Sequence, residues 1–532
     1  MDIKRLAKLV ASIDAKRDAV ATKYDEVASF IFPERAGFVT RRETQDDGRG
    51  EIFDSTGEEA NTILAAALHS LLTNPASAWF ALDLLGAEKE SKEETEWLTE
   101  VQRVMLDVFS SPETGFQNEV NTFYLDLGPF GWAVFYTEDE AGKPIRFRAV
   151  PPARASIAEN ADGQVDTLVL HEMKTCSQLY EDFGDKVSDQ VRQMLERDSQ
   201  AEVEIIHVIM PRAKLPIRQG GMRTSRHAMA SVIYEKATEQ VLSESGFHER
   251  PFQVPRWAKV SGGLYGIGPG WAALPDMRVA NEVARSQLIG AEKLSDPPLL
   301  VPDDGVVGKL RSDASGITYY KPGFGDKITT LPITADIGVM EGIIEKRQDS
   351  IRRRFLNDRI MLAGGPQMTA FEVATRENKQ MLVLGPVLGR LQTEFLGPLI
   401  ERVFGILYRR GELPPVPDSL RGRDLRVRYV SPIARAQKQV EAAAFNQAVQ
   451  YLAPVAQMDG SVLDNFDADA IARDTQELFG YPAKYLRGED QVKKLREARA
   501  QVQQAREGME AMRQMAQTAN AAAGAGRMAE GQ

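Results

Sequence analysis

The feature that most constrains the fold of this chain is a helical segment over residues 336–361 that ends in turn residues. Its apolar positions repeat at spacings of three, four and seven, which predicts a helix with one buried face. These positions are Ile337, Met340, Ile344, Ile351 and Phe355. Gly364, Gly365 and Pro366 end the segment, and a second long helix is predicted over residues 369–410.

Positive charge on the first of these helices runs against the acidic background of the chain, whose formal net charge is -11. Six basic side chains fall within fourteen positions: Lys346, Arg347, Arg352, Arg353, Arg354 and Arg359. A positive stripe on a rigid helix next to a Gly-Pro loop is what a surface in contact with a polyanion needs. A solvated helix face is the alternative interpretation of the same charges.

Length and composition indicate a folded chain built from several parts. A length of 532 residues predicts three or four domains or subdomains. No apolar run reaches the ~18 residues of a transmembrane helix, and the N-terminus lacks the apolar core of a signal peptide. Cys176 is the only cysteine, which excludes an intrachain disulfide and suits a reducing compartment. The pI near 5.3 restricts any contact with DNA to local surfaces.

The predicted elements are mainly α, with a mixed α+β block in the first half of the chain. Helices are predicted over residues 1–35, from an N-cap at Asp54 or Ser55 to residue 73, and over residues 91–110, 116–127 and 271–294. β-rich runs lie at residues 79–85, 132–139, 145–152, 167–174, 202–210 and 229–236, with a short helical piece at 176–197. Residues 299–335 are predicted to form short strands and turns, and the region from residue 431 on is predicted to be helical.

The sequence contains none of the common catalytic or cofactor-binding motifs. It has no G-x-x-x-x-G-K-[ST] loop, no H-E-x-x-H pair, no cysteine pair for zinc and no G-x-S-x-G turn. The five histidines lack ligand spacing. Gly266, Gly268 and Gly270 are interpreted as a turn that starts the next helix, because no clear strand precedes them and Pro269 interrupts them. We therefore expect no enzyme activity, cofactor or metal.

Three segments, in order along the chain, resemble the portal, or head-to-tail connector, family of short-tailed bacteriophages (podoviruses). The first contains IFPERAGF, IFDSTGEEA and LHSLLTNPASAWF, between residues 31 and 80. The second begins with YGIGPGWAALPDMRVAN at residue 265 and ends with SDPPLLVP at residue 302. The third, residues 368–415, contains T-A-x-E-V-x-x-R and then G-P-x-x-G-R-x-x-x-E-x-x-x-P-L-I, the most specific of the patterns. Beyond residue 415 the chain resembles the family only in its helical character.

The resemblance implies the portal fold, in which wing, stem, clip and crown regions assemble as a ring. It assigns the wing to residues 1–265, the stem helices to 266–298 and 336–361, and the clip to 299–335. A tunnel loop is implied at 362–368, and its candidate residues are Ala363, Gly364, Gly365, Pro366 and Gln367. A wing return helix and strand are implied for 369–430. A helical crown with a disordered C-terminal tail is implied for 431–532.

The function implied by the resemblance is that of a portal protein at one capsid vertex. Such a ring is the channel for DNA entry during terminase-driven packaging and for DNA exit during ejection, and it is the platform for tail attachment. The implied partners are other copies of the chain, usually twelve in a ring, together with double-stranded DNA, the terminase large subunit, tail adaptor proteins, and capsid and scaffolding proteins. No membrane is involved. The expected location is the virion, after assembly in the host cytoplasm.

DNA must move through such a ring without being gripped. Duplex DNA carries one charge per ~1.7 Å of its axis, so an extensive basic lining would bind it and stop its movement, whereas a few basic rings are compatible with sliding. The candidate channel residues are Lys346, Arg347, Arg352, Arg353 and Arg354. In the alternative interpretation these side chains pair with Glu341, Glu345 or Asp349 on the same or neighbouring stem helices. Both interpretations stay open.

Two other functions fit parts of the sequence. An internal scaffold or core protein of a virion would share the Ala/Gln-rich helices and the absence of catalytic motifs, but it would need neither the clip-like insert nor a closed ring. A nucleic-acid-processing enzyme would need clustered carboxylates for metal-assisted phosphoryl chemistry. No such cluster can be recognised in the sequence.

Overall fold

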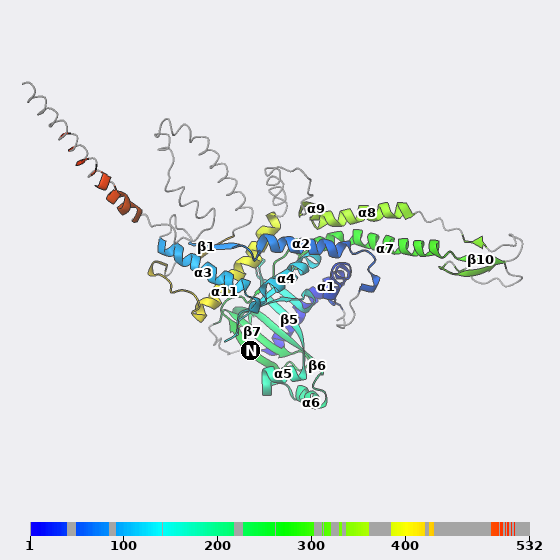
Figure 1. Ribbon diagram of the computed structural model, residues 1–532. Helices are drawn as coiled ribbons and strands as arrows, with labels where there is room; N and C mark the ends of the chain where they lie inside the picture. The colour runs from blue at the N-terminus through cyan, green and yellow to red at the C-terminus, as the bar shows by residue number, and fades with distance from the viewer. Residues whose placement is uncertain are drawn as a thin grey trace, which may run out of the picture. The chain divides into compact units, whose positions relative to one another are not determined.

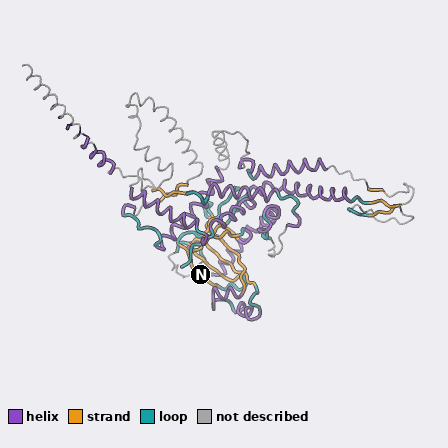
Figure 2. The backbone as a smooth tube through the Cα atoms, viewed as in Figure 1, coloured by secondary structure: helices purple, strands orange, loops and turns teal. Residues whose placement is uncertain are grey.

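Helices and β-sheets are mixed along the chain in the computed structural model (Figure 1, Figure 2). The chain divides into two compact units, one of Met1–Ala81, Gln102–Leu413 and Val427–Ile433, the other of Leu82–Val101, Pro414–Arg426 and Ala434–Gln532. The structure describes residues 2–39, 49–84, 92–140, 142–216, 227–260, 262–302, 311, 313–320, 329–331, 337–360, 385–420, 425–429, 491–499, 501–503, 506, 508–509, 512 and 515.

The predicted N-terminal helix is confirmed as α1, Ile3–Ile31. Its N-cap is Asp2, whose side chain accepts a hydrogen bond from the backbone N–H of Arg5. The helix ends just before Pro33, which cannot continue the hydrogen-bond ladder. Its buried positions follow helical spacing: Leu6, Val10, Ile13, Ala21, Tyr24, Val27, Ala28 and Ile31. One face of α1 is therefore part of the core, as the periodicity predicts.

The other helices predicted in the first half of the chain are also confirmed. They are α2 (Thr56–Leu72), α3 (Lys92–Ser110) and α4 (Phe116–Phe130). The N-cap of α2 is Ser55, one of the two predicted residues, but its side chain makes no capping bond. Asp54, one residue before it, accepts a hydrogen bond from the N–H of Thr56 at 3.1 Å. The single helical piece predicted between the strands is two helices, α5 (Cys176–Phe183) and α6 (Asp189–Arg197), because Gly184 adopts a positive φ and ends α5.

The largest sheet is antiparallel and has the strand order β4-β5-β6-β7-β8. Its strands are β4 (Ala155–Glu159), β5 (Val165–Thr175), β6 (Glu202–Pro211), β7 (Met229–Glu235) and β8 (Val241–Phe247). A second sheet has the order β3-β2-β9, from β2 (Val134–Glu138), β3 (Arg146–Val150) and β9 (Phe252–Gln253). The predicted runs are confirmed in both sheets. The sequence analysis missed β4, β8 and β9, which lie at the edges of the two sheets.

The core lies where α1 and α4 meet these sheets, and aromatic side chains dominate it. Tyr24 of α1 packs against Phe38, Phe130 and Trp132. The Tyr24 hydroxyl is satisfied in this apolar setting because it donates to the Gly266 carbonyl at 2.9 Å. The chain segment after α1 folds back along the helix because the Asp25 carboxylate accepts the N–H groups of three consecutive residues, Gly37, Phe38 and Val39.

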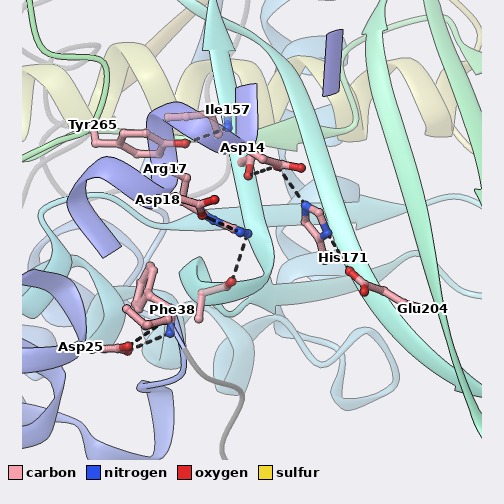
Figure 3. A network of polar contacts seen from close by, with 12 residues as sticks. Asp14, Arg17, Asp18, Asp25, Phe38, Ile157, His171, Glu204 and Tyr265 are labelled. Carbon is pink, nitrogen blue, oxygen red and sulfur yellow. Dashed lines mark hydrogen bonds and ion pairs between the residues drawn. The ribbon is translucent and has the colours of Figure 1, made fainter. Parts of the chain in front are cut away.

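A polar network fastens α1 to the five-stranded sheet (Figure 3). The His171 ring lies between Asp14 of α1 and Glu204 of β6, with nitrogen to oxygen distances of 3.0 and 3.1 Å. Asp14 also accepts the hydroxyl proton of Ser156 at 2.6 Å. Burial alone would lower the pKa of His171, but its bonds to the two carboxylates outweigh burial and raise that pKa above the usual 6.5. His171 is therefore protonated more readily than a free histidine side chain.

The stabilisation from His171 is expected to depend on pH. Because the folded-state pKa is raised, the contribution is full below the unfolded pKa of 6.5 and is lost as pH rises through the folded value. We expect His171→Gln to lower the thermal unfolding midpoint more at about pH 5.5 than at about pH 8.5. Differential scanning fluorimetry of the wild type and of His171→Gln across this pH range measures the difference in unfolding midpoint. Equal losses at both values would show that the charge of His171 does not contribute.

The glycines of the 266–270 segment allow its backbone to lie directly against the backbone at the end of α4. A Cβ atom on Gly266 would lie 1.9 Å from the Gly131 carbonyl oxygen, and one on Gly268 would lie 2.3 Å from the Gly128 carbonyl oxygen. Gly131 itself has a φ of 71° and forms the C-cap of α4. The segment therefore packs backbone against backbone at the end of α4 and then enters the next helix. This placement confirms the predicted turn.

The helix predicted over residues 369–410 is described from residue 385 on. It is helical at 385–391, contains a π-helical turn at Gln392–Leu396 and continues as α11, Gly397–Arg410. Gly411 ends it in the left-handed conformation, as a C-cap glycine does. Short strands β1 (Phe80–Leu84) and β13 (Leu425–Tyr429) and a helical stretch at 491–499 are also described. The predicted crown, 431–532, lies largely outside the described residues.

Candidate functional site

Two long helices lie side by side and extend away from the sheets of the first unit (Figure 1). They are α7, Pro269–Ser295, and α8, Ile337–Arg354. A small sheet lies at the C-terminal end of α7 (Figure 2). Its strands are β10 (Leu299–Pro302), β11 (Ile317–Tyr320) and β12 (Thr329–Thr330). β10 lies between the other two, parallel to β11 and antiparallel to β12. The described residues of the predicted insert thus form the short strands that the sequence predicts.

The basic helix is shorter than the sequence predicts. The segment 336–361 is not one helix, because α8 ends at Arg354 and a separate turn of helix, α9, follows at Asn357–Ile360. Leu356 between them has a φ of 62°, which breaks the helical ladder. No glycine or proline marks this break in the sequence. Phe355, the residue just before this break, is fully buried in the first unit.

A buried carboxylate on α7 holds α8 in place. Asp276 is 6% exposed and accepts three hydrogen bonds from α8. Arg347 Nη1 donates to Oδ1 at 3.0 Å, Arg354 Nε to Oδ2 at 3.1 Å, and Ser350 Oγ to Oδ2 at 2.9 Å. Burial alone would raise the pKa of Asp276, but these three donors outweigh burial and hold that pKa below its usual value. Asp276 therefore carries its charge and joins two turns of α8 to α7.

The chain just before α2 fastens onto the same two helices. Asn281 of α7 accepts the N–H of Phe53 at 2.6 Å and donates to the Glu51 carbonyl at 3.0 Å. Gln348 of α8 donates to the Asp54 carboxylate at 2.7 Å, while the other oxygen of Asp54 accepts the N–H of Thr56. The position of α8 is therefore fixed by contacts with α7 and with the start of α2.

The predicted basic residues differ in the partners that their side chains have in the structure. Arg347 and Arg354 share Asp276. Arg352 lies 3.7 Å from Glu59 of α2 and 3.8 Å from Asp349, which are weak, half-exposed pairs. The remaining two side chains are Arg353, whose Nε donates to the Asp349 carbonyl, and Lys346, which makes no side-chain hydrogen bond or ion pair with the described residues.

Lys346 and Arg353 lie on one exposed face of α8. They are seven residues apart, and with about 100° of rotation per residue they point about 140 to 180° away from Ile344 and Ile351. Ile351 is fully buried, whereas Lys346 and Arg353 are exposed. Two cations without a carboxylate partner in the described part of the chain thus face away from the packed side of the helix. Such a face can attract an anion without binding it tightly.

Asp276 is the site residue that the sequence analysis missed. The ion-pair partners that the sequence suggests for the arginines are Glu341, Glu345 and Asp349, and of these only Asp349 lies near one of them, 3.8 Å from Arg352. A signal for Asp276 does exist, because it lies within the apolar stripe of α7 with Ala273, Leu274, Met277 and Ala280. An acid in a buried stripe needs a charged partner. The predicted tunnel-loop residues, Ala363 to Gln367, lie outside the described residues.

Groups suited to catalysis or metal binding are scattered. Among the described residues, His, Cys, Asp and Glu side chains form no group of three that could hold a metal ion. Burial lowers the pKa of His207 to about 4, so this histidine is neutral and bonds to Ser231 at 2.8 Å. None of the described helices has the length and apolar character that a bilayer-spanning helix needs.

Comparison with known proteins gives a consistent match over the chain. Residues 3–486 match a family described as "Bacteriophage head to tail connecting protein". The "Probable portal protein" of Bordetella phage BPP-1 is 32% identical over 519 residues, which are 94% of this chain and 92% of that protein. The "Portal protein" of Salmonella phage epsilon15 is 30% identical over 519 residues, with the same coverage of both chains.

Among solved structures, a chain of the "Virion of native gene transfer agent (GTA) particle" aligns with 82% of this chain and 92% of its own length. The identity is 12% and the TM-score 0.36, values too low to bear on the fold.

Proposed function

The chain belongs to the bacteriophage head-to-tail connecting protein family, and from this premise we propose that its copies form a ring, usually of twelve subunits, at one capsid vertex. In this role DNA enters the head through the ring during terminase-driven packaging and leaves through it during ejection. Tail adaptor proteins bind the ring afterwards, and capsid and scaffolding proteins surround it during assembly in the host cytoplasm. The protein acts as a passage and docking platform, without catalysis.

The observation that carries this proposal is the α7/α8 pair with a small sheet at its end. We assign α7 and α8 to the stem, the β10–β12 sheet to the clip, the sheets with α1 to α4 to the wing, residues 362–368 to the tunnel loop and residues 431–532 to the crown. Exposed apolar side chains on the helix pair support assembly: Leu288, Ile289, Leu294, Val339 and Ile343 are each more than a third exposed. Apolar surface of this kind is suited to burial against a neighbouring copy.

Electron microscopy of the purified full-length protein, viewed end-on, tests the ring. Twelve copies of 58.9 kDa give roughly 700 kDa, which native mass spectrometry can check on the same sample. We expect closed rings with a central hole wide enough for duplex DNA. A filament, or a compact oligomer without a hole, would contradict the proposed function.

The five candidate basic residues are expected to divide between two roles. We propose that Lys346 and Arg353, which lack a carboxylate partner among the described residues, face the channel and guide DNA. Arg347 and Arg354 keep α8 in place through Asp276, and Arg352 has only its weak pairs with Glu59 and Asp349. Twelvefold repetition makes Lys346 and Arg353 two rings of positive charge, enough to attract the phosphate backbone while allowing movement.

Replacing both residues, Lys346→Gln with Arg353→Gln, is expected to lower the amount of DNA packaged several-fold while rings still form, because only the electrostatic attraction is removed. A packaging assay with purified proheads and terminase measures it. The matched control is Lys8→Gln with Lys186→Gln, which removes the same charge at exposed positions outside the helix pair. Packaging at the level of the control would exclude a channel role for Lys346 and Arg353.

A further inference from the structure

We propose that neighbouring copies in the ring bind through opposite flanks of α8. The acidic flank is Glu341 with Glu345, and the basic flank is Arg347 with Arg354. In this arrangement the acidic flank of one copy contacts the basic flank of the next. The inference rests on the proposed function, because it presupposes a ring. It goes further by naming the side chains that join the copies and set their direction around the ring.

The acidic flank has no partner within the described part of its own chain. Glu341 and Glu345 are exposed and make no side-chain hydrogen bond or ion pair with described residues. They are four residues apart, so both lie on one face of α8, where two like charges repel each other. A cation from another molecule would remove this repulsion.

The basic flank has unused binding capacity. Arg347 and Arg354 are both bound to the single carboxylate of Asp276, so two positive charges face one negative charge. Their side chains remain 47% and 46% exposed. Each guanidinium has five N–H donors, and each uses one of them on Asp276. A second carboxylate can therefore bind without displacing Asp276.

Helix geometry places the two flanks where adjacent copies in a ring would meet. Glu345 and Arg347 are two residues apart, which gives about 160° of separation around the axis and a rise of about 3 Å along it. When identical helices stand side by side and point the same way, Glu345 of one copy lies about 3 Å along the axis from Arg347 of the next, an offset that two long side chains can span, whereas Glu341 and Arg354 lie farther along the axis from these two residues. A contact between two different surfaces, repeated head to tail, closes into a ring.

A positively charged strip lies between the two flanks of α8, while Arg352 lies on the side of Glu345, seven residues from it, and has its weak pairs with Glu59 and Asp349 there. Lys346 and Arg353 lie between the flanks, on the exposed face opposite the buried residues. The flanks are used for assembly, and the strip between them stays available for DNA. Like-charged flanks would repel, so the arrangement also excludes copies that meet in the reverse order.

The test uses charge reversal in the full-length chain. The acid-reversed variant carries Glu341→Lys and Glu345→Lys, and the base-reversed variant carries Arg347→Glu. We expect each variant alone to form at least tenfold fewer rings than the wild type, measured by mass photometry at equal concentration. When the two variants are mixed in equal amounts, opposite flanks face each other again at every contact if the copies alternate. The mixture is therefore expected to recover rings that contain equal numbers of both variants.

The control variant carries Glu113→Lys and Glu196→Lys, which changes the net charge equally at exposed positions outside α8. It is expected to form rings like the wild type. Glu341 and Glu345 make no contact that the described fold needs, so a loss of rings in the acid-reversed variant reports assembly. Wild-type levels of ring in the acid-reversed variant would overturn the inference while leaving the proposed function standing. Absence of rings from the wild type itself would instead contradict the proposed function.

Discussion

Replacing Gly131 with alanine is expected to unfold the first unit or to cost it more than about 4 kcal/mol. Two effects add at this position. The φ of 71° places the residue in a region that L side chains rarely adopt. A Cβ atom would also lie 2.1 Å from the backbone nitrogen of Gly268 and 2.2 Å from the carbonyl carbon of Ile267. Backbone atoms cannot rotate away, so α4 would have to separate from the start of α7.

Gly142→Ala is the matched control, because Gly142 has a similar φ of 76° but nothing within 4 Å of its Cβ position. We expect it to cost only the conformational strain, about 1 to 2 kcal/mol. Tryptophan fluorescence during denaturant unfolding measures both variants. Trp132 is directly next to Gly131 and fully buried, so it reports this region. If both variants unfold at the same denaturant concentration, the close backbone contact between Gly131 and the segment at Ile267 and Gly268 is absent.

Replacing Asp276 with alanine is the second change with a large expected effect. It removes one carboxylate and leaves Arg347, Arg354 and Ser350 without their partner on α7. Breaking a buried ion pair costs about 3–5 kcal/mol. Because both arginines are nearly half exposed and can be hydrated, we expect about 2 kcal/mol here. The loss should be local to α8, whose attachment to α7 depends on this contact.

Hydrogen exchange of the α8 backbone, residues 337–354, measures this loss directly. Asp349→Ala is the control on the same helix, since Asp349 is 69% exposed and lies 3.8 Å from Arg352. We expect the control to change protection little and Asp276→Ala to reduce it by more than tenfold. Because the folded pKa of Asp276 is lowered, its contribution is full above the unfolded value of 3.8 and is lost only as pH falls through the folded value. Unchanged α8 protection in Asp276→Ala would show that apolar packing alone holds the helix pair.

The helices and most strands could be predicted because their signals are local. The apolar spacing of α1 and the polar residues Asp54 and Ser55 at the start of α2 can be recognised without knowledge of any distant partner. The edge strands β4 and β8 were missed because their pairing with the neighbouring strand stabilises them more than their own composition does. The end of α8 at Arg354 was also missed, since Leu356 carries no turn signal and its left-handed conformation is fixed by the surrounding packing.

The sequence by itself determined that this chain has a basic helix in an acidic background, an insert between two long helices, and the motifs of its family. Tertiary structure alone decided what the basic side chains do. Asp276, 71 positions before Arg347 in sequence, takes two of the arginines as partners and leaves Lys346 and Arg353 without a carboxylate among the described residues. Charge is a property of each residue, but its effect depends on which opposite charge the fold brings within a few ångströms.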